Sequence, residues 1–263
     1  MLSIQPLIDI VNAGIIIRME DGIILIDKPA GMTSFGVVAR IRRVLSEGEG
    51  KRAARATDSL RARSDEGKPL AVPHKRKRVK VGHTGTLDPF ATGLMILTIG
   101  KECKNAGMYT KLDKVYEATF RLGQTSSTGD PEGALTEVSA IEPARETLEK
   151  VLEQFTGEIS QKPPIFSAIK INGQRAYHLA RNGQEVEIPT RRITIHSLEL
   201  IDYSYPEVKI RTHVSSGTYI RSLAVDIGEA LGTGAYCGQL RRTKIADFSV
   251  ENAKKLEDFG ITD

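Results

Sequence analysis

Groups able to do chemistry concentrate in one short segment, Gly82–Gly93, which reads GHTGTLDPFATG. Three glycines and a proline between two apolar stretches predict a tight loop of the kind that carries function. The loop offers one carboxylate, Asp88, and one imidazole, His83. Because Asp before Pro is common in simple turns, and a lone histidine is often only a turn residue, the residue types alone leave both a structural and a catalytic interpretation open.

Other familiar chemistries are disfavoured by spacing. Gly93 and Gly100 are wrongly spaced for a phosphate-binding P-loop, and Glu102 stands where that motif needs Ser or Thr. Neither a G-x-S-x-G nor a G-x-G-x-x-G motif occurs. No metal-site spacing connects the histidines, which are His74, His83, His178, His196 and His213. We therefore expect no metal and no cofactor, and chemistry done by side chains alone.

The elements that must position the loop are predicted from hydrophobic periodicity. The predicted strands are Gly22–Pro29, Gly93–Ile99, Val115–Leu122, Ile165–Ile171, Ile193–Tyr203, Val208–Val214 and Ala235–Ile245. The predicted helices are Pro143–Phe155, Ala176–Arg181, one from Gly217 to about Leu231, and one capped by Ser34 with Phe35, Val38, Ile41 and Leu45 on its inner face. Strands and helices without a regular βαβ repeat favour an α+β fold around a large sheet.

Length and composition describe one large globular domain. The chain has 263 residues, 40% of them hydrophobic, with a mean hydropathy of -0.23. No apolar run approaches the roughly 18 residues of a membrane span, and the start of the chain lacks the basic region of a signal peptide. Two cysteines, Cys103 and Cys237, cannot form a disulfide framework or a zinc cage. We expect a cytoplasmic protein with no membrane association.

The net charge of +4 hides an uneven distribution. Lys51–Lys80 contains 11 Lys and Arg against 3 Asp and Glu, a local charge of +8, which leaves −4 for the rest of the chain. From about residue 47 to 78 the apolar periodicity is lost, so we predict a flexible basic insertion. Such a segment attracts nucleic acid, although a solvated loop is an equally simple interpretation of charge alone.

A family resemblance decides between these interpretations. The stretch Lys80–Leu97, KVGHTGTLDPFATGLMIL, resembles the signature of the TruB family of tRNA pseudouridine-55 synthases. Further blocks resemble the family's motifs in the same order and extend the likeness from about Gly22 to Phe259. These blocks are Asp27–Ser34, Lys114–Ala118 continuing into Leu122–Gln124, Gln161–Lys170 leading into Ala176–Arg181, Gly217–Ser222 and Leu240–Arg242.

The resemblance implies a pseudouridine-synthase-like α+β fold, with a large, mixed, mostly antiparallel central sheet flanked by helices and loops. It implies a single catalytic domain over residues 1–263 that isomerises uridine 55 in the T loop of tRNA. In that reaction the base is flipped out, its glycosidic bond is cleaved, the base rotates, and a carbon–carbon glycosidic bond forms. No cofactor is implied.

The resemblance also implies roles for individual residues. Asp88 corresponds to the essential aspartate, whose attack on C6 or on C1′ of the uridine stays open. Arg221 corresponds to the arginine that pairs with it, since a neighbouring cation favours the ionised carboxylate and a planar guanidinium fork orients it. Tyr116 corresponds to the tyrosine that stacks on the base and is a candidate for proton abstraction. Tyr219 and Leu240 correspond to residues that line the uracil pocket.

RNA binding is likewise implied by the resemblance. His83 corresponds to the histidine that occupies the space left by the flipped base. Residues 164–192 correspond to an RNA-gripping loop that offers basic side chains to phosphates, namely Lys170, Arg175, Arg181, Arg191 and Arg192. The expected partner is the T arm of tRNA. We expect a monomer with no obligatory protein partner.

Two departures from the family pattern leave alternatives open. The chain ends at Asp263, so no C-terminal RNA-binding PUA domain is expected, and the basic insertion at about 47–78 could partly replace it as an electrostatic tether. A related guide-RNA-dependent synthase of archaea and eukaryotes is disfavoured, because that protein needs the PUA domain. A tRNA-folding chaperone is a third reading, disfavoured because RNA binding alone does not require Asp88, Tyr116 and Arg221 together.

Overall fold

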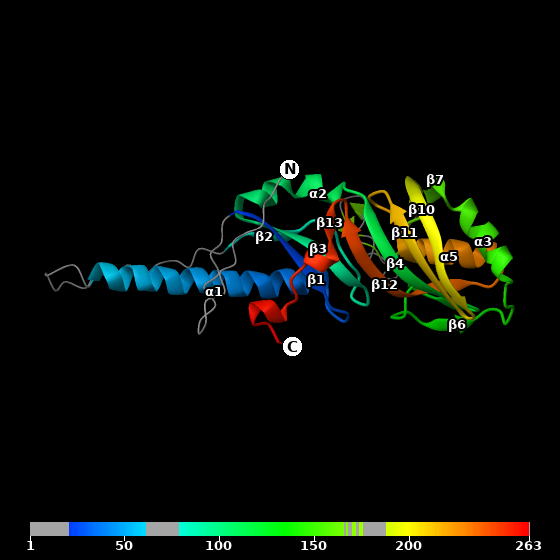
Figure 1. The fold of residues 1–263 in the computed structure, drawn as a ribbon, viewed down its shortest axis with the longest axis horizontal. Coiled ribbons are helices and arrows are strands. Elements are labelled where there is room, and N and C mark those ends of the chain that lie inside the picture. The colour runs from blue at the N-terminus through cyan, green and yellow to red at the C-terminus, as the bar shows by residue number, and fades with distance from the viewer. Residues whose placement is uncertain are drawn as a thin grey trace.

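The computed structural model describes residues 21–61, 79–165, 167, 170–171, 174–175 and 188–262. Within them a nine-stranded sheet forms the centre of the molecule (Figure 1). In spatial order its main path is β1 (Gly22–Lys28), β3 (Thr92–Ile99), β12 (Ala235–Ile245), β4 (Lys114–Leu122), β11 (Glu207–Val214), β10 (Arg191–Ser204) and β7 (Gly157–Gln161). Two short strands complete it, β2 (Val81–His83) beside β3 and β13 (Phe248–Ser249) beside β12.

The pairing is antiparallel except between β12 and β3, where Arg241 lies opposite Thr92 and Arg242 opposite Gly93. Two separate hairpins each form a small sheet, β5 (Gln124–Ser126) with β6 (Leu135–Glu137) and β8 (Lys170–Ile171) with β9 (Gln174–Arg175). The predicted α+β fold with a mixed, mostly antiparallel sheet is confirmed. The single parallel pair matters because it brings the end of β12 against the loop that precedes β3.

Helices lie against the central sheet (Figure 1), and near β1 and β3 apolar side chains are buried on both sheet faces, Ile24 in one core cluster and Ile23 in another. In β4, side chains alternate between buried and half-buried, with Tyr116, Ala118, Phe120 and Leu122 inward. Helix α5 (Ile220–Ala230) packs on β12, and α3 (Arg145–Gln154) packs on β10. The remaining helical segments are α1 (Ser34–Arg61), α2 (Ala106–Thr110), η1 (Gly100–Asn105), η2 (Val250–Asn252) and η3 (Glu257–Phe259).

Helix α1 differs from its prediction in three respects. Phe35 is exposed, because it lies about 200° around the helix from Val37, and Val37 takes the inner face instead. The N-cap is Thr33, whose hydroxyl accepts from the Gly36 N–H at 2.9 Å, and not Ser34. The helix also continues to Arg61, into the segment predicted to be a flexible insertion. Ala, Lys and Arg are strong helix formers, so this segment is helical without an apolar periodicity.

The predicted strand over Ile165–Ile171 is confirmed at Lys170–Ile171 but is wrong at Ile165 and Ser167, the other residues of this stretch that the structure describes. There the Ser167 N–H donates to the Ile165 carbonyl at 3.0 Å. Ser167 is buried and lines a pocket described below. The predicted helix at Ala176–Arg181 lies outside the described residues.

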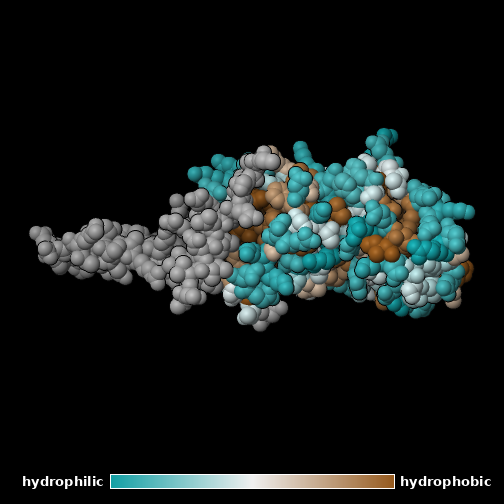
Figure 2. Space-filling view, viewed as in Figure 1, coloured by the Kyte–Doolittle hydropathy of each residue, from teal (hydrophilic) through white to brown (hydrophobic). Residues whose placement is uncertain are grey.

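The surface on the face shown in Figure 2 is mainly hydrophilic, with separate apolar patches. Among the described residues, no helix combines the length and apolar character needed to cross a membrane. The longest helix, α1, carries a strongly charged sequence, RIRRVLSEGEGKR, through its middle.

Candidate active site

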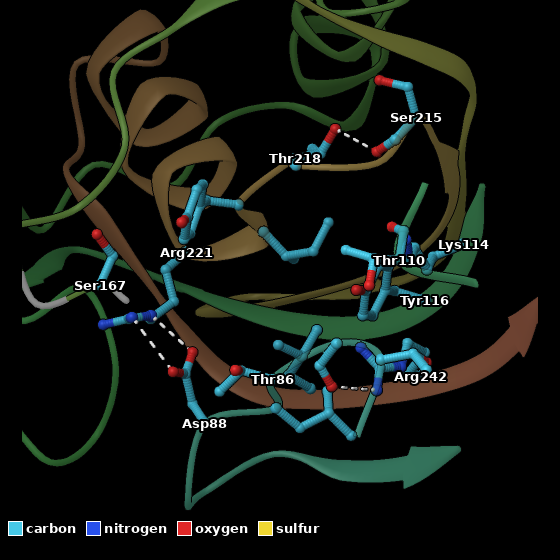
Figure 3. Close-up of a pocket in the computed structure, with 17 residues that line it drawn as sticks. Thr86, Asp88, Thr110, Lys114, Tyr116, Ser167, Ser215, Thr218, Arg221 and Arg242 are labelled. Atoms are coloured by element: carbon cyan, nitrogen blue, oxygen red, sulfur yellow. Dashed lines mark hydrogen bonds and ion pairs between the residues drawn. The ribbon is translucent and has the colours of Figure 1, made fainter. Parts of the chain in front are cut away.

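A cavity of about 260 Å³ lies between the Gly82–Gly93 loop, strands β4 and β12, and the first turn of α5 (Figure 3). Five of the predicted site residues line it, namely Asp88, Tyr116, Tyr219, Arg221 and Leu240. They come from four separate stretches of chain, and the sheet order β3-β12-β4 brings three of those stretches side by side. The geometry therefore assembles one pocket from residues that the sequence separates by up to 152 positions (88 to 240).

Hydrogen bonds hold the loop at two residues that precede Asp88. The Ser34 hydroxyl donates to the Leu87 carbonyl at 2.9 Å and accepts from the Leu87 N–H at 2.8 Å. The Arg242 guanidinium donates to the Gly85 carbonyl at 3.1 Å. Three residues on, the Ala91 N–H donates to the Asp88 carbonyl at 3.2 Å. Because these bonds hold the backbone of the loop, its one carboxylate has a defined direction.

A buried lysine adds a further fastening. The Lys28 side chain is fully buried, and its ammonium donates to the carbonyls of Pro29 at 2.8 Å, Met32 at 2.6 Å and Pro89 at 3.1 Å. Burial lowers the pKa of Lys28 to about 8, while the nearby Asp88 carboxylate opposes this change. The motif around Lys28 was identified from its resemblance alone, and the structure shows its physical purpose: the lysine joins β1 to the loop beside Asp88.

Arg221 grips Asp88 with two nitrogens. Its Nε lies 3.0 Å from Asp88 Oδ2, and its Nη2 donates to Asp88 Oδ1 at 3.4 Å (Figure 3). The guanidinium is almost completely buried, with 4% of the side chain exposed, whereas 33% of the Asp88 side chain is exposed. This fork-to-carboxylate arrangement fixes the plane of the carboxylate and leaves part of it facing the cavity.

A second carboxylate, Asp130, completes the arrangement, and sequence reasoning missed it. The Arg221 Nη1 donates to Asp130 Oδ2 at 2.9 Å and to the Thr128 carbonyl at 2.8 Å. Asp130 is itself buried and accepts from the Glu132 N–H at 3.1 Å. The sequence Asp130-Pro-Glu-Gly is typical of a turn, and it forms one, with the Gly133 N–H donating to the Asp130 carbonyl at 3.4 Å. No sequence signal marks the side chain, because its partner is 91 residues away.

Burial raises the pKa of Asp88, and the neighbouring Asp130 carboxylate adds to this rise. Arg221 and Lys28 act in the opposite direction, since both cations favour the ionised form. Arg221 therefore lowers the pKa of Asp88, as expected, but desolvation raises this pKa by more. The site holds a carboxylate that is costly to ionise beside the two cations that make ionisation possible.

The remaining walls combine hydroxyl-bearing and cationic side chains with aromatic and aliphatic ones, the latter including Tyr116, Tyr219 and Leu240. Tyr116 and Leu240, from neighbouring strands, are each 8% exposed. Tyr219 precedes the first residue of α5, and the Arg191 guanidinium carbon lies 5.5 Å from the centroid of its ring. Aromatic and aliphatic surfaces facing one carboxylate form a space suited to a flat ring with a reactive carbon.

Of the other predicted RNA-contacting residues, His83, Arg191 and Arg192 are described and are not among the residues that line the cavity. His83 is half-buried in β2, opposite Leu97, and does not line the pocket. Arg191 and Arg192 begin β10, Arg192 being exposed. Lys170 and Arg175 are paired across the β8–β9 hairpin, and Arg181 lies outside the described residues.

One group of side chains could accept a metal ion. Asp113, His196 and His213 place their ligand atoms within 4.8 Å of one another, with His196 Nε2 3.1 Å from Asp113 Oδ2. The histidines meet because a register shift beside His196 sets both rings, 4.6 Å apart, on the same face of β10 and β11. His213 alternates with the inward Thr212 and Val214, so this half-exposed group lies on the sheet face opposite the pocket. Sequence spacing could not reveal it.

Comparison with solved structures supports the same fold. A chain from the crystal structure of a Cbf5-Nop10-Gar1 complex is similar with a TM-score of 0.61 and 28% sequence identity, over 90% of this chain and 52% of that one. A chain from an H/ACA RNP bound to a substrate RNA containing 2'-deoxyuridine is similar with a TM-score of 0.59 and 25% identity, over 90% and 51%. The chain thus spans about half the length of these solved relatives.

Curated sequence relatives are more similar. The tRNA pseudouridine synthase B of Azoarcus sp. (strain BH72) is 43% identical over 240 residues, which cover 91% of this chain and 70% of the relative. Proteins of the same name from Aquifex aeolicus (strain VF5) and Phocaeicola vulgatus are 42% and 40% identical, with 73% and 92% of their own lengths covered.

Two family models divide the chain between them. Residues 74–220 match the TruB family pseudouridylate synthase N-terminal domain, and residues 221–261 match the tRNA pseudouridylate synthase B C-terminal domain. The boundary falls between Ile220 and Arg221, within the first turn of α5, so the first model contains Asp88 and the second contains its arginine partner. With its fold, its Asp–Arg pocket and these matches taken together, the chain belongs to the TruB family of pseudouridylate synthases.

Proposed function

We propose that this protein converts uridine 55, in the T loop of tRNA, to pseudouridine. The observation that carries the proposal is the Asp88–Arg221 pair, which presents a partly exposed carboxylate to a pocket walled by Tyr116, Tyr219 and Leu240. The sequence resemblance to pseudouridine-55 synthases and the relatives named tRNA pseudouridine synthase B support this choice of substrate.

Family membership implies an isomerisation in which no atom is gained from a co-substrate. The N1–C1′ bond of the uridine breaks, the uracil turns, and a C5–C1′ bond forms. The hydrogen on C5 leaves as a proton and N1 takes up a proton, so the composition of the nucleoside is unchanged. Asp88 supplies the negative charge or the nucleophile that meets the nucleoside, at C6 or at C1′. Arg221 holds the carboxylate ionised and in plane.

The pocket walls suit the rotation step. A detached uracil must turn without escaping, which requires close apolar surfaces and few fixed hydrogen bonds. Tyr116 and Leu240 provide such surfaces, and the Tyr116 hydroxyl is the candidate group for removing the proton from C5. Extruding the base from the T loop costs roughly a few kcal/mol, which contacts with the RNA must offset. We assign His83 to the space vacated by the base, and the basic residues of the 164–192 segment to phosphates.

Bacterial-type tRNA modification is favoured over the guide-RNA-dependent reaction. The sequence identity of this chain to the proteins named tRNA pseudouridine synthase B above is 40–43%, whereas its identity to the chains from the Cbf5 and H/ACA assemblies is 25–28%. A guide-dependent enzyme acting alone on an unguided tRNA transcript would give no product, so an activity assay with such a transcript distinguishes the two reactions.

The test uses a tRNA transcript tritiated at C5 of its uracils. Because pseudouridine formation releases the C5 hydrogen, tritium in the solvent measures the reaction. We expect about one equivalent of tritium per transcript, and none from a matched transcript with cytidine at position 55. Equal release from both transcripts would overturn the assignment to position 55, and no release from a bound transcript would overturn tRNA as the substrate.

A further inference from the structure

The side-chain amide of Gln161 is fully buried and does not line the pocket, but it hydrogen-bonds to the backbone of Tyr219, which does. The Gln161 side chain is 0% exposed, its Oε1 accepts from the Tyr219 N–H at 2.8 Å, and its Nε2 donates to the Tyr219 carbonyl at 3.0 Å. Both ends of the amide therefore act on the backbone of one residue. An uncharged carboxamide suits this position, since it offers a donor and an acceptor together.

Gln161 also marks one end of the segment proposed to grip RNA. It is the last residue of β7, and its Cα partner across the sheet is Arg191, the first residue of β10. The chain between them, 162–190, contains most of that segment. Arg191 stacks its guanidinium over the Tyr219 ring. Thus both flanks of the segment contact Tyr219, one through its backbone and the other through its ring.

Tyr219 in turn sets the position of the catalytic arginine. It occupies the N-cap position of α5, and Arg221 is the second residue of that helix. The Arg221 side chain must reach Asp88 and Asp130 at about 3 Å. Displacement of Tyr219 would therefore move one wall of the pocket together with the base of the Asp–Arg pair.

We propose that Gln161 is a positioning residue. It fixes Tyr219 and the start of α5 to the two paired ends of the 162–190 segment, so that this segment and the Asp88–Arg221 pair keep a constant geometry relative to each other. The inference rests on the proposed function and deepens it. Gln161 need not touch the substrate, because it acts through Tyr219. Removing it should reduce the rate of reaction in bound RNA more than it weakens RNA binding.

The test compares three variants in single-turnover tritium release, with the dissociation constant for tRNA measured separately. For Gln161→Ala we expect the rate at saturating enzyme to fall about 10- to 100-fold, since small displacements of reacting groups are costly, and the dissociation constant to stay within about threefold. Tyr203→Phe is the matched control. It removes a partly buried hydroxyl that donates to the distant Pro143 carbonyl at 2.7 Å, a bond that involves neither α5 nor the 162–190 segment, and should react at nearly the wild-type rate.

Gln161→Glu separates positioning from general packing. A buried carboxyl group has a raised pKa, and in its protonated form it offers one donor and one acceptor, as the amide does. The rate of Gln161→Glu relative to wild type should therefore recover as the pH is lowered, while Gln161→Ala should show no recovery. Thermal unfolding of each variant, measured in the assay buffer, confirms that the folded protein is compared.

The outcomes are distinguishable from failure of the proposed function. If wild type releases tritium and Gln161→Ala reacts at the same rate, the inference is wrong and the function stands. Equal losses in Gln161→Ala and Tyr203→Phe, or a Gln161→Ala defect that resides wholly in RNA affinity, would also overturn it. If wild type itself releases none, the proposed function fails first.

Discussion

The two ends of the pocket use charge in different ways. At one end, Arg221 and Asp130 hold the Asp88 carboxylate, which keeps a third of its side chain exposed toward the cavity. At the other end lie two buried cations, Lys114 and Arg242 (Figure 3). Both ends are rich in charge, but among the described lining residues only Asp88, at the first end, presents a carboxylate to a ligand.

The cations of the second end are engaged by backbone carbonyls. Arg242 donates to Leu94 at 2.7 Å and to Gly85 at 3.1 Å, and Lys114 donates to Thr110 at 2.7 Å. Burial, together with the neighbouring Arg242, lowers the pKa of Lys114 to about 8. Charge at this end therefore holds the walls together, while charge at the Asp88 end is available for chemistry. Variants at the two ends should fail in different ways.

The largest expected effect is the loss of activity in Asp88→Asn. The amide cannot act as an anion or nucleophile, so we expect single-turnover tritium release to fall by roughly 10³-fold or more. Arg221 keeps its bonds to Asp130 and Thr128, so the free energy of unfolding and the affinity for tRNA should change little. A variant that retains one tenth of the wild-type rate would contradict the assigned role.

Arg242→Met should show the opposite pattern. It leaves the buried carbonyls of Leu94 and Gly85 without their donor, and we expect the free energy of unfolding to fall by about 2–4 kcal/mol. Urea denaturation provides the measurement. At a temperature where the variant is folded, its rate should stay within about tenfold of wild type. Unchanged stability would show that the cation does not hold the wall.

Arg221→Lys sharpens the comparison within the catalytic end. A single ammonium cannot reproduce contacts to Asp88, Asp130 and the Thr128 carbonyl, and we expect a rate loss of roughly 30- to 100-fold. An ammonium group that makes fewer contacts with Asp88 also opposes the rise in the pKa of Asp88 less effectively. Because the ionised carboxylate is required, activity should be lost at a higher pH than in wild type as the solution is acidified. An unchanged acid limb in the pH profile of kcat/KM would show that Arg221 does not control this ionisation.

The smallest predicted effect concerns the stability contributed by Lys28. Its pKa is lowered from 10.5 to about 8 in the folded state, so between these values the unfolded chain binds more protons. Stability should therefore rise with pH across the window from about 8 to 10.5. Below this window Lys28 is protonated in both states, so its contribution to stability should no longer change with pH. Denaturation of wild type and Lys28→Met at several pH values isolates the effect, because Lys114 is common to both. A difference that does not vary with pH would contradict it.

Sequence reasoning succeeded where local patterns carry the information. The apolar run Gly93–Ile99 predicted β3, and the stretches Ile193–Tyr203 and Val208–Val214 predicted strands β10 and β11. The family motifs identified five residues that line one pocket. Periodicity and motif order are properties of the chain itself, so they can be recognised before folding.

The rest depends on partners distant in sequence. Asp130 has the signature of a turn residue, and only Arg221 reveals its second role. Lys28 looks like a surface lysine until three carbonyls surround it, and Gln161 stands 58 residues from the backbone that it holds. Burial of a polar side chain depends on what surrounds it in three dimensions, which hydrophobic periodicity does not encode.

The central claim is that charge serves chemistry at one end of the pocket and structure at the other. The most direct test measures tritium release and urea denaturation side by side for Asp88→Asn and Arg242→Met. We predict that Asp88→Asn keeps its stability and loses its activity, whereas Arg242→Met loses stability and, while folded, reacts within about tenfold of the wild-type rate. If both variants lose activity and stability to the same extent, the two ends act as one structural unit and the account is wrong.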